Sequence, residues 1–351
     1  MKYKIFLISI IFLLDLGLVF AGIYYGGNAK SIDCGDITNY IFEQTTGDEL
    51  KDMILQNVRI PPIFAAIFVG LSLSVCGLML QTLFRNFLAS PYTTGITSGV
   101  LLFASFVIFL KSFSELFAAF GPDKLLIGGW IGGLISIIIL VIIASKIKDV
   151  NDIIVVSLLM SYFLGGIRAY LVANADPASV MTYYFFALGS ITGIRPEDLP
   201  IIGTCSLLFA LCAFLAIKPL NALLFGESYA KSFGLSVKKI RILILASTAF
   251  VAGSIMPYVG SINFVGVAAP FIARPLIKTS DHRWLVPTTL LTGIFLMLVC
   301  HFITFKYNLP FSYLLGIDRP VSVIPIGSVL DIVGGLLVIY LVVSREKKIK
   351  I

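Results

Sequence analysis

The sequence predicts an all-α integral membrane protein with about ten transmembrane helices. Of its 351 residues, 58% are hydrophobic and only 13% are charged. The mean hydropathy of +1.00 lies far above that of a soluble domain. About ten apolar runs approach the ~20 residues that a helix needs to cross a bilayer. They are continuously apolar, which excludes the alternating pattern of a membrane β-barrel. We therefore expect one transmembrane domain over residues 1–351.

The expected spans follow one another along the whole chain. They lie at residues 5–25, 63–83, 93–110, 125–145, 153–173, 200–217, 242–258, 262–275, 285–305 and 324–343. The first has a basic start but no clear cleavage site, so we interpret it as an uncleaved span. The eighth is short and contains Pro270, which predicts a partial or broken helix. Glycine clusters at 128–133, 165–166 and 334–335 favour close packing between helices over a nucleotide-binding loop, because no strand precedes them.

The distribution of positive charge predicts the orientation. With a cytoplasmic N-terminus, the inside segments hold 17 Lys and Arg residues and the outside segments hold 8. This bias favours both termini in the cytoplasm. It makes residues 26–59 an acidic extracellular loop, long enough for a short surface helix, and it places residues 218–241 in the cytoplasm. Because the net charge of +7 sits in short loops, it indicates membrane topology and not nucleic-acid binding.

The chain offers little chemistry of its own. It has no G-x-x-x-x-G-K-S/T motif, so a separate subunit would have to bind ATP. Two isolated histidines and five cysteines without ligand spacing predict no metal site, no cofactor and no catalytic centre. Arg168 lies near the outer end of the fifth span. It either reaches toward the membrane surface or faces a translocation pathway.

The polar, basic segment from Lys218 to Arg241 interrupts the apolar pattern. Glu227 to Phe233 is compatible with a helix, Gly234 with its C-terminal end, and Ser236 with the N-cap of the next helix. Two short helices joined at a glycine would form a compact docking surface. A generic basic loop is the alternative.

Several segments in a fixed order carry a family resemblance. They are Arg59-Ile60-Pro61-Pro62, Gln81 to Pro91, Ala187-Leu188-Gly189-Ser190, Phe225 to Leu235, and Gly260 to Arg283 with its Asp281-His282-Arg283 triplet. From about residue 55 to the end, this order resembles the FecCD-type permeases. These are the membrane subunits of binding-protein-dependent ABC importers for iron-siderophore complexes, haem and cobalamin.

The resemblance implies the type II ABC importer permease architecture and a set of partners. These are a second copy of the chain, two ATP-binding subunits and an extracellular or periplasmic substrate-binding protein. Contacts with the ATPase would fall on Gly226, Glu227, Ala230, Lys231, Phe233 and Gly234. Binding-protein docking would use Arg59 with Lys306 or Arg319, because Pro62 stands at the family's second arginine. Phe87 and Phe271 also depart from the family pattern, and Phe311 to Asp318 resembles an insertion.

The function expected from the resemblance is import of an iron chelate of the siderophore type across the cell membrane. Transport would proceed by alternating access driven by separate ATPase subunits, so the chain itself would not be an enzyme. Haem, cobalamin or molybdate stays open as cargo, although molybdate would favour polar residues along the dimer axis. A secondary transporter or channel would work without ATP, and a membrane enzyme would need a buried catalytic cluster.

Overall fold

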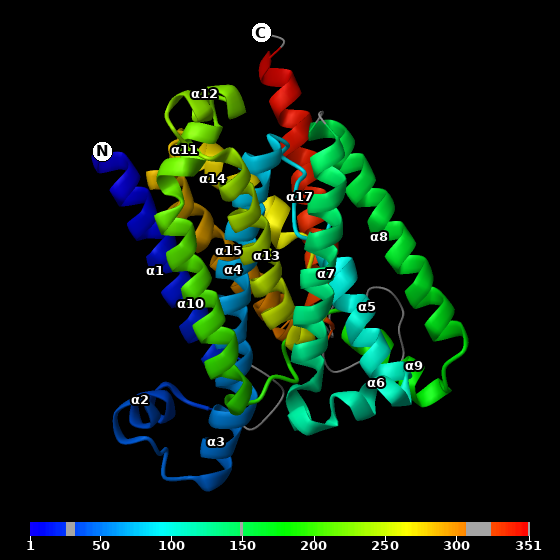
Figure 1. Cartoon of the computed structure of the whole chain (residues 1–351). Helices are drawn as coiled ribbons and strands as arrows, with labels where there is room; N and C mark the ends of the chain where they lie inside the picture. Colours follow the sequence, from blue (N-terminus) through cyan, green and yellow to red (C-terminus); the bar gives the residue numbers. More distant parts are fainter. Residues whose placement is uncertain (26–31, 148–149, 307–323, 350–351) are drawn as a thin grey trace.

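The computed structural model describes residues 1–25, 32–147, 150–306 and 324–349 as a bundle of α-helices (Figure 1). Within these ranges, seven helices are long and apolar enough to cross a membrane. Three shorter apolar helices, Ile96–Phe109, Val265–Ile277 and Ile326–Tyr340, accompany them. The predicted all-α membrane fold is confirmed.

The bundle helices in chain order are α1 (Lys2–Tyr25), α4 (Ile60–Phe84), α5 (Ile96–Phe109), α7 (Lys124–Lys146), α8 (Val150–Ala173), α10 (Leu199–Leu215), α13 (Val237–Val259), α14 (Val265–Ile277), α15 (His282–Lys306) and α17 (Ile326–Ile349). Each predicted span corresponds to one of them, with ends that differ by a few residues. Short helices fill the connections: α2 (Cys34–Glu43), α3 (Glu49–Ile54), the π-helical turn η1 (Leu55–Arg59), α6 (Lys111–Leu116), η2 (Ala118–Asp123), α9 (Pro177–Ala187), η3 (Pro196–Asp198), α11 (Ile217–Leu223) and α12 (Glu227–Ser232).

Helix α4 is the centre of the bundle and packs against α10, α13, α14 and α15. Some of these helices approach α4 so closely that only glycine fits at the contact. A Cβ atom at Gly77 would lie 1.7 Å from the carbonyl oxygen of Gly266 in α14, so neither backbone could keep its place. The predicted glycine packing is confirmed at Gly132, where a Cβ atom would lie 2.3 Å from the Gly99 oxygen, but Gly166 has nothing within 4 Å.

The eighth span is a partial helix of 13 residues, one of the two predicted forms, but it is not broken. Helix α14 is short, yet it continues through Pro270 and Pro275. Pro270 has no N–H for the carbonyl oxygen of Gly266, four residues earlier. The side-chain Nε2 of Gln81 lies 3.5 Å from that oxygen and forms a long hydrogen bond in its place. A neighbouring helix thus compensates for the missing backbone bond.

The two ends of the bundle differ in what they carry (Figure 1). The N-terminus, the last turns of α17, and the short helices α11 and α12 lie at one end, which we call the terminal end. Helices α2, α3, α6 and α9 lie at the opposite end. Residues 32–59, the described part of the loop 26–59, and residues 218–241 were expected on opposite sides of a membrane, and they lie at opposite ends of the bundle.

Candidate functional site

The segment 218–241 forms α11, α12 and the start of α13 at the terminal end. Gly226 has φ 103° and Gly234 has φ 78°, both in the left-handed region that favours glycine. These two residues delimit α12, so the predicted short helix and its glycine end are confirmed. Ser236 stands at the N-cap of α13, but its side chain makes no capping hydrogen bond, contrary to the expected cap.

An aromatic row covers the outer face of α12. Phe225, Tyr229 and Phe233 are spaced four residues apart and are 70%, 44% and 65% exposed. Their ring centroids are 5.0 Å and 4.6 Å apart along the row. Ala230 is fully buried on the inner side, where it packs with the main core of the bundle. The helix therefore has an anchored inner face and an apolar outer face, as a docking helix needs.

An ion pair holds α12 against α13. Arg241 Nη2 donates a hydrogen bond to Glu227 Oε1, and both side chains are about two thirds buried or more. Lys231, in the last turn of α12, is exposed. The pair fixes the short helix to the long bundle helix that follows it.

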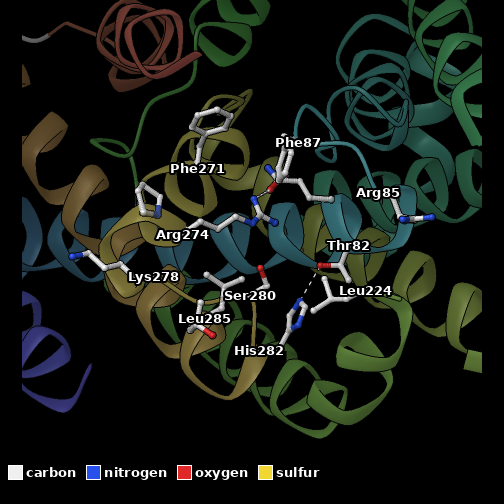
Figure 2. A pocket seen from close by; sticks show the side chains of 13 residues that line it. Thr82, Arg85, Phe87, Leu224, Phe271, Arg274, Lys278, Ser280, His282 and Leu285 are labelled. Carbon is white, nitrogen blue, oxygen red and sulfur yellow. Dashed lines mark hydrogen bonds between the residues drawn. The ribbon is translucent and has the colours of Figure 1, made fainter. Parts of the chain in front are cut away.

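Asn221 of α11 connects this segment to two bundle helices. Its Nδ2 donates to Asp281 Oδ1 at 2.7 Å, and its Oδ1 accepts hydrogen bonds from the backbone N–H and the ring Nδ1 of His282, both at 2.8 Å. The other ring nitrogen of His282 lies 2.9 Å from Thr82 Oγ1 in α4, as Figure 2 shows. His282 is fully buried. These four residues form the Asn221 network, which joins α11, α15 and α4.

The charge of Asp281 is consistent with this network. Its burial would raise the pKa, but hydrogen bonds from the Arg283 backbone N–H and from the Asn221 amide outweigh burial and lower the pKa below its ordinary value. The carboxylate therefore stays ionised and orients the Asn221 amide. Sequence reasoning missed Asn221. The sequence offered two signals for it: the position of Asn221 inside the polar segment, and the Asp281-His282 pair later in the chain.

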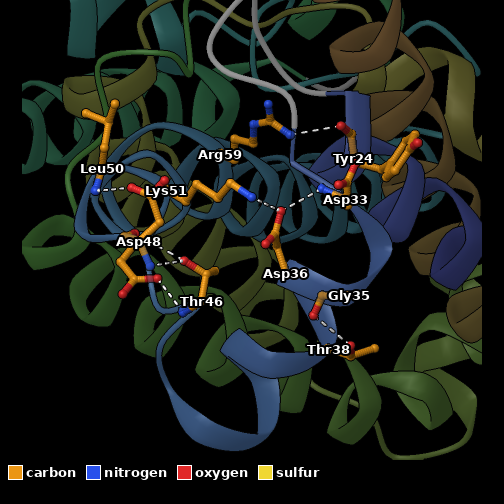
Figure 3. Close-up of polar contacts among 11 residues, drawn as sticks. Tyr24, Asp33, Gly35, Asp36, Thr38, Thr46, Asp48, Leu50, Lys51 and Arg59 are labelled. Carbon is orange, nitrogen blue, oxygen red and sulfur yellow. Dashed lines mark hydrogen bonds and ion pairs between the residues drawn. The ribbon is translucent and has the colours of Figure 1, made fainter.

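At the opposite end, the Arg59 side chain forms hydrogen bonds with the backbone of another helix of the chain (Figure 3). Its side chain is 4% exposed, and Nη1 donates to the carbonyl oxygens of Ile23 at 2.6 Å and Tyr24 at 2.8 Å. Arg59 therefore ties η1 to the last turn of α1. Binding-protein docking through Arg59 stays a prediction, and it would require the guanidinium to leave these carbonyl groups. Lys306 is the last residue of α15, and Arg319 lies outside the described residues.

The α2–α3 hairpin has its own polar contacts (Figure 3). Lys51 Nζ lies 2.6 Å from Asp36 Oδ2, which also accepts the Asp33 backbone N–H at 2.8 Å. Thr45 and Thr46 bind the carboxylate of Asp52. The predicted surface helix in this loop is confirmed, and a second short helix, α3, follows it.

Arg168 lies in α8 with a half-buried side chain. Its Nε is buried and has no hydrogen-bond partner among the described residues. Gly165 lies one turn earlier, and a Cβ atom there would lie 3.6 Å from Arg168 Nη2. Because glycine has no side chain, the space beside the guanidinium is left open. A role in a translocation pathway stays a prediction. In the described part of the chain, no three His, Cys, Asp or Glu side chains gather as a metal site would require.

Solved structures with a similar fold come first. The chain aligns over 96% of its length, and 99% of the other chain, with an inward-facing structure described as a candidate metal-chelate type ABC transporter, with a TM-score of 0.79 and 24% identity. A second structure, PsaBC from Streptococcus pneumoniae in complex with Fab, matches 87% of this chain and 95% of that chain with a TM-score of 0.58 and 16% identity. The chain therefore shares the fold of the first of these structures over almost its whole length.

Comparison with sequence families is more specific. The model of the FecCD transport family matches residues 13–344, and the chain belongs to this family. It is thus a multi-pass ABC transporter permease subunit that works with an ATPase and a binding protein, and it is not itself an enzyme.

The curated relatives of the chain carry names of transporter permeases, which is consistent with this family. A candidate ABC transporter permease of Methanocaldococcus jannaschii is 53% identical over 348 residues, 99% of each chain. The hemin transport system permease of Yersinia pestis is 25% identical over 310 residues, 88% of each chain. The Fe(3+)-citrate import system permease of Bacillus subtilis is 28% identical over 309 residues, 86% of this chain and 85% of that one.

Proposed function

We propose that this chain imports an iron chelate of the siderophore type. The family supports this proposal, as do relatives whose names give hemin and Fe(3+)-citrate as cargo. Haem, cobalamin and molybdate are the alternative cargoes by the same mechanism. The chain would form a single permease domain over residues 1–351 and pair with a second copy of itself. Two ATP-binding subunits and one extracellular or periplasmic binding protein would complete the transporter.

The segment 218–241 is the proposed contact with the ATPase, and its geometry is the observation that carries the proposal. Gly226, Glu227, Ala230, Lys231, Phe233 and Gly234 would form the coupling surface. The exposed aromatic row supports this role because it gives a docking partner an apolar face on an anchored helix. The charge bias of 17 against 8 supports a cytoplasmic terminal end, where an ATPase would lie.

The Asn221 network is the proposed route from this contact into the bundle. A displacement of α12 would move α11 through the short connection at 224–226. Asn221 would carry the displacement to α15 through His282 and to α4 through Thr82. Because α4 is the centre of the bundle, a shift there would move several helices together. Arg168 is the proposed pathway residue, and its half-buried guanidinium would suit an anionic chelate.

Reconstitution tests the proposal. The chain is expressed with its candidate ATPase and binding-protein neighbours and placed in proteoliposomes, and ATP hydrolysis is measured with empty and loaded binding protein. We expect an iron-siderophore-loaded protein to stimulate hydrolysis. Stimulation by a binding protein loaded with haem, cobalamin or molybdate would change the proposed cargo and leave the proposed mechanism unchanged.

The same vesicles test the other class of function. A secondary transporter would move the chelate without ATP and without an associated ATPase. Cargo uptake in ATP-free vesicles, with no ATPase retained during purification, would overturn the importer mechanism.

A further inference from the structure

Two membrane helices carry opposite charges on the outer side of the bundle. Arg168 lies in α8, five residues before Ala173, the last residue of that helix. Asp331 lies in α17, five residues after Ile326, the first residue of that helix, and its side chain is exposed. Large apolar side chains are exposed on both helices, among them Phe163, Tyr170, Ile332 and Leu336. Each charge therefore lies on a surface that is otherwise largely apolar.

The two charges lie at a comparable depth. Helix α8 ends and α17 begins toward the end of the bundle that carries α2, α3, α6 and α9 (Figure 1). Five residues correspond to about 7.5 Å along a helix axis, because an α-helix rises about 1.5 Å per residue. Arg168 and Asp331 are thus about equally far inside their helices, measured from the same end of the bundle.

Arg168 and Asp331 do not meet within one chain. Helix α8 packs mainly against α5, whereas α17 packs against α14 and α15. Within the described residues, neither side chain forms an ion pair, and Arg168 Nε is buried without a hydrogen-bond partner. A charge inside the hydrocarbon is unfavourable unless it is paired or reaches water. A long arginine side chain can extend to the membrane surface, but the short side chain of aspartate cannot.

The surface next to each charge leaves room for another helix. Gly166 in α8 is exposed, and a Cβ atom there would meet nothing within 4 Å. Gly335 lies one turn after Asp331, and a Cβ atom there would meet only the ring of Phe264, at 3.9 Å. Small residues on a membrane helix let another helix approach closely. Both glycines lie on the same side of their charged residue, toward the terminal end.

We propose that Arg168 of each copy pairs with Asp331 of a second copy of the chain, so that α8 of one copy lies against α17 of the other. The inference rests on the second copy that the proposed function includes. In a two-fold dimer each such contact occurs twice, so neither charge stays unpaired. A guanidinium and a carboxylate can form two parallel hydrogen bonds, which suits a contact inside a membrane. An anionic chelate would then have to displace Asp331 to reach Arg168.

Cysteine crosslinking in membranes tests the contact. Arg168→Cys and Asp331→Cys are combined in one chain, the membranes are oxidised with copper phenanthroline, and the products are separated on a denaturing gel. We expect a covalent dimer from the combined variant and none from the native chain or either single variant. Absence of the dimer from the combined variant would overturn the proposal. A dimer from a single variant would overturn it too, because like residues would then face each other.

A second pair of cysteines is the matched control. Thr204 is exposed and lies five residues after Leu199, the first residue of α10. Figure 1 shows α10 on one side of α4 and α8 on the other. Thr204→Cys combined with Asp331→Cys should therefore give no covalent dimer. A dimer of equal yield from this control would show random collisions in the membrane and would contradict the proposal.

A charge swap tests the ion pair itself. Arg168→Asp places two acids at each contact and should weaken dimerisation, measured by native mass spectrometry from detergent, by about tenfold or more. Arg168→Asp combined with Asp331→Arg restores both pairs and should return dimerisation close to the native level. Native dimerisation of the single variant, or no recovery in the swapped variant, would contradict the proposal.

Neither measurement involves ATP or cargo, so the inference and the proposed function can fail separately. A covalent dimer without chelate-stimulated ATP hydrolysis would support the contact and reject the proposed transport. Stimulated hydrolysis without the covalent dimer would reject the contact alone.

Discussion

Glu227 is the residue whose charge matters most for the proposed contact with the ATPase. It bonds Arg241, and an ion pair this close to solvent contributes about 0–1 kcal/mol to stability. Glu227→Arg should therefore leave the protein folded, but it would place two cations together and displace α12. We predict loss of stimulated ATP hydrolysis with an unchanged elution volume and circular dichroism spectrum.

A charge swap is the control for that variant. Glu227→Arg combined with Arg241→Glu restores an attractive pair and should recover part of the stimulation. Normal stimulation in Glu227→Arg alone would remove α12 from the coupling surface.

Asn221 gives a second prediction at the residue scale. Asn221→Ala removes the acceptor for two His282 nitrogens and the donor to Asp281. A buried polar group left without its partner costs about 1–3 kcal/mol, so the unfolding midpoint should fall measurably. Stimulated ATP hydrolysis should fall as well, because the route to α15 and α4 is interrupted.

Asn57→Ala is the matched control for that prediction. Asn57 is exposed, and its Nδ2 donates only to the Met53 carbonyl oxygen at 3.2 Å. Its removal should change stability by about 0.5 kcal/mol or less. Equal effects of the two variants would mean that the Asn221 network has no special role.

At the scale of elements, the crossing of α4 and α14 depends on Gly77. The Cβ atom of Gly77→Ala would lie 1.7 Å from the Gly266 oxygen, so the two helices would have to separate. We predict a large loss of thermal stability, in the range of about 1–3 kcal/mol or more that overpacking costs. Gly17→Ala in α1, where nothing lies within 4 Å, should be nearly neutral in the same assay. A neutral Gly77→Ala would contradict this packing.

The α2–α3 hairpin should depend on pH. The hydrogen bond from Lys51, followed by that from the Asp33 backbone, lowers the pKa of Asp36. A carboxyl whose pKa is lower in the folded state stabilises it above the unfolded pKa, and this contribution disappears as the pH falls through the folded pKa. Hydrogen exchange in α2 should therefore gain protection from acid to neutral pH by more than the intrinsic rate explains. Asp36→Asn should remove that gain, and its persistence in the variant would exclude Asp36 as the cause.

Much of the element structure follows from sequence patterns, and the failures have physical causes. Within the described residues, apolar runs located the ten bundle helices, because membrane helices need continuous apolar surface. Gly234 predicted the C-terminal end of α12, because the left-handed conformation at this position favours glycine. Only the alternative of a break at Pro270 is wrong, because the compensating partner, Gln81, comes from a helix that is distant in sequence. The burial of Arg59 and the contacts of Asn221 likewise depend on segments far away in sequence.

At the scale of the whole molecule, the family and the fold agree. The chain belongs to the FecCD transport family, and the two ends of its helix bundle offer different surfaces. The terminal end carries the anchored aromatic row, while the opposite end carries the α2–α3 hairpin with the exposed Phe42. Under the proposed function, the ATPase meets the first end and the binding protein meets the second.

Site-specific photocrosslinking tests this central claim most directly. Benzoylphenylalanine replaces either Phe233 at the C-cap of α12 or Phe42 in α2, which are 65% and 84% exposed. The complete transporter is then irradiated, and the crosslinked products are identified by mass spectrometry. We predict that position 233 crosslinks to the ATPase and that position 42 does not. An ATPase crosslink from position 42, or none from position 233 in an intact complex, would contradict the account.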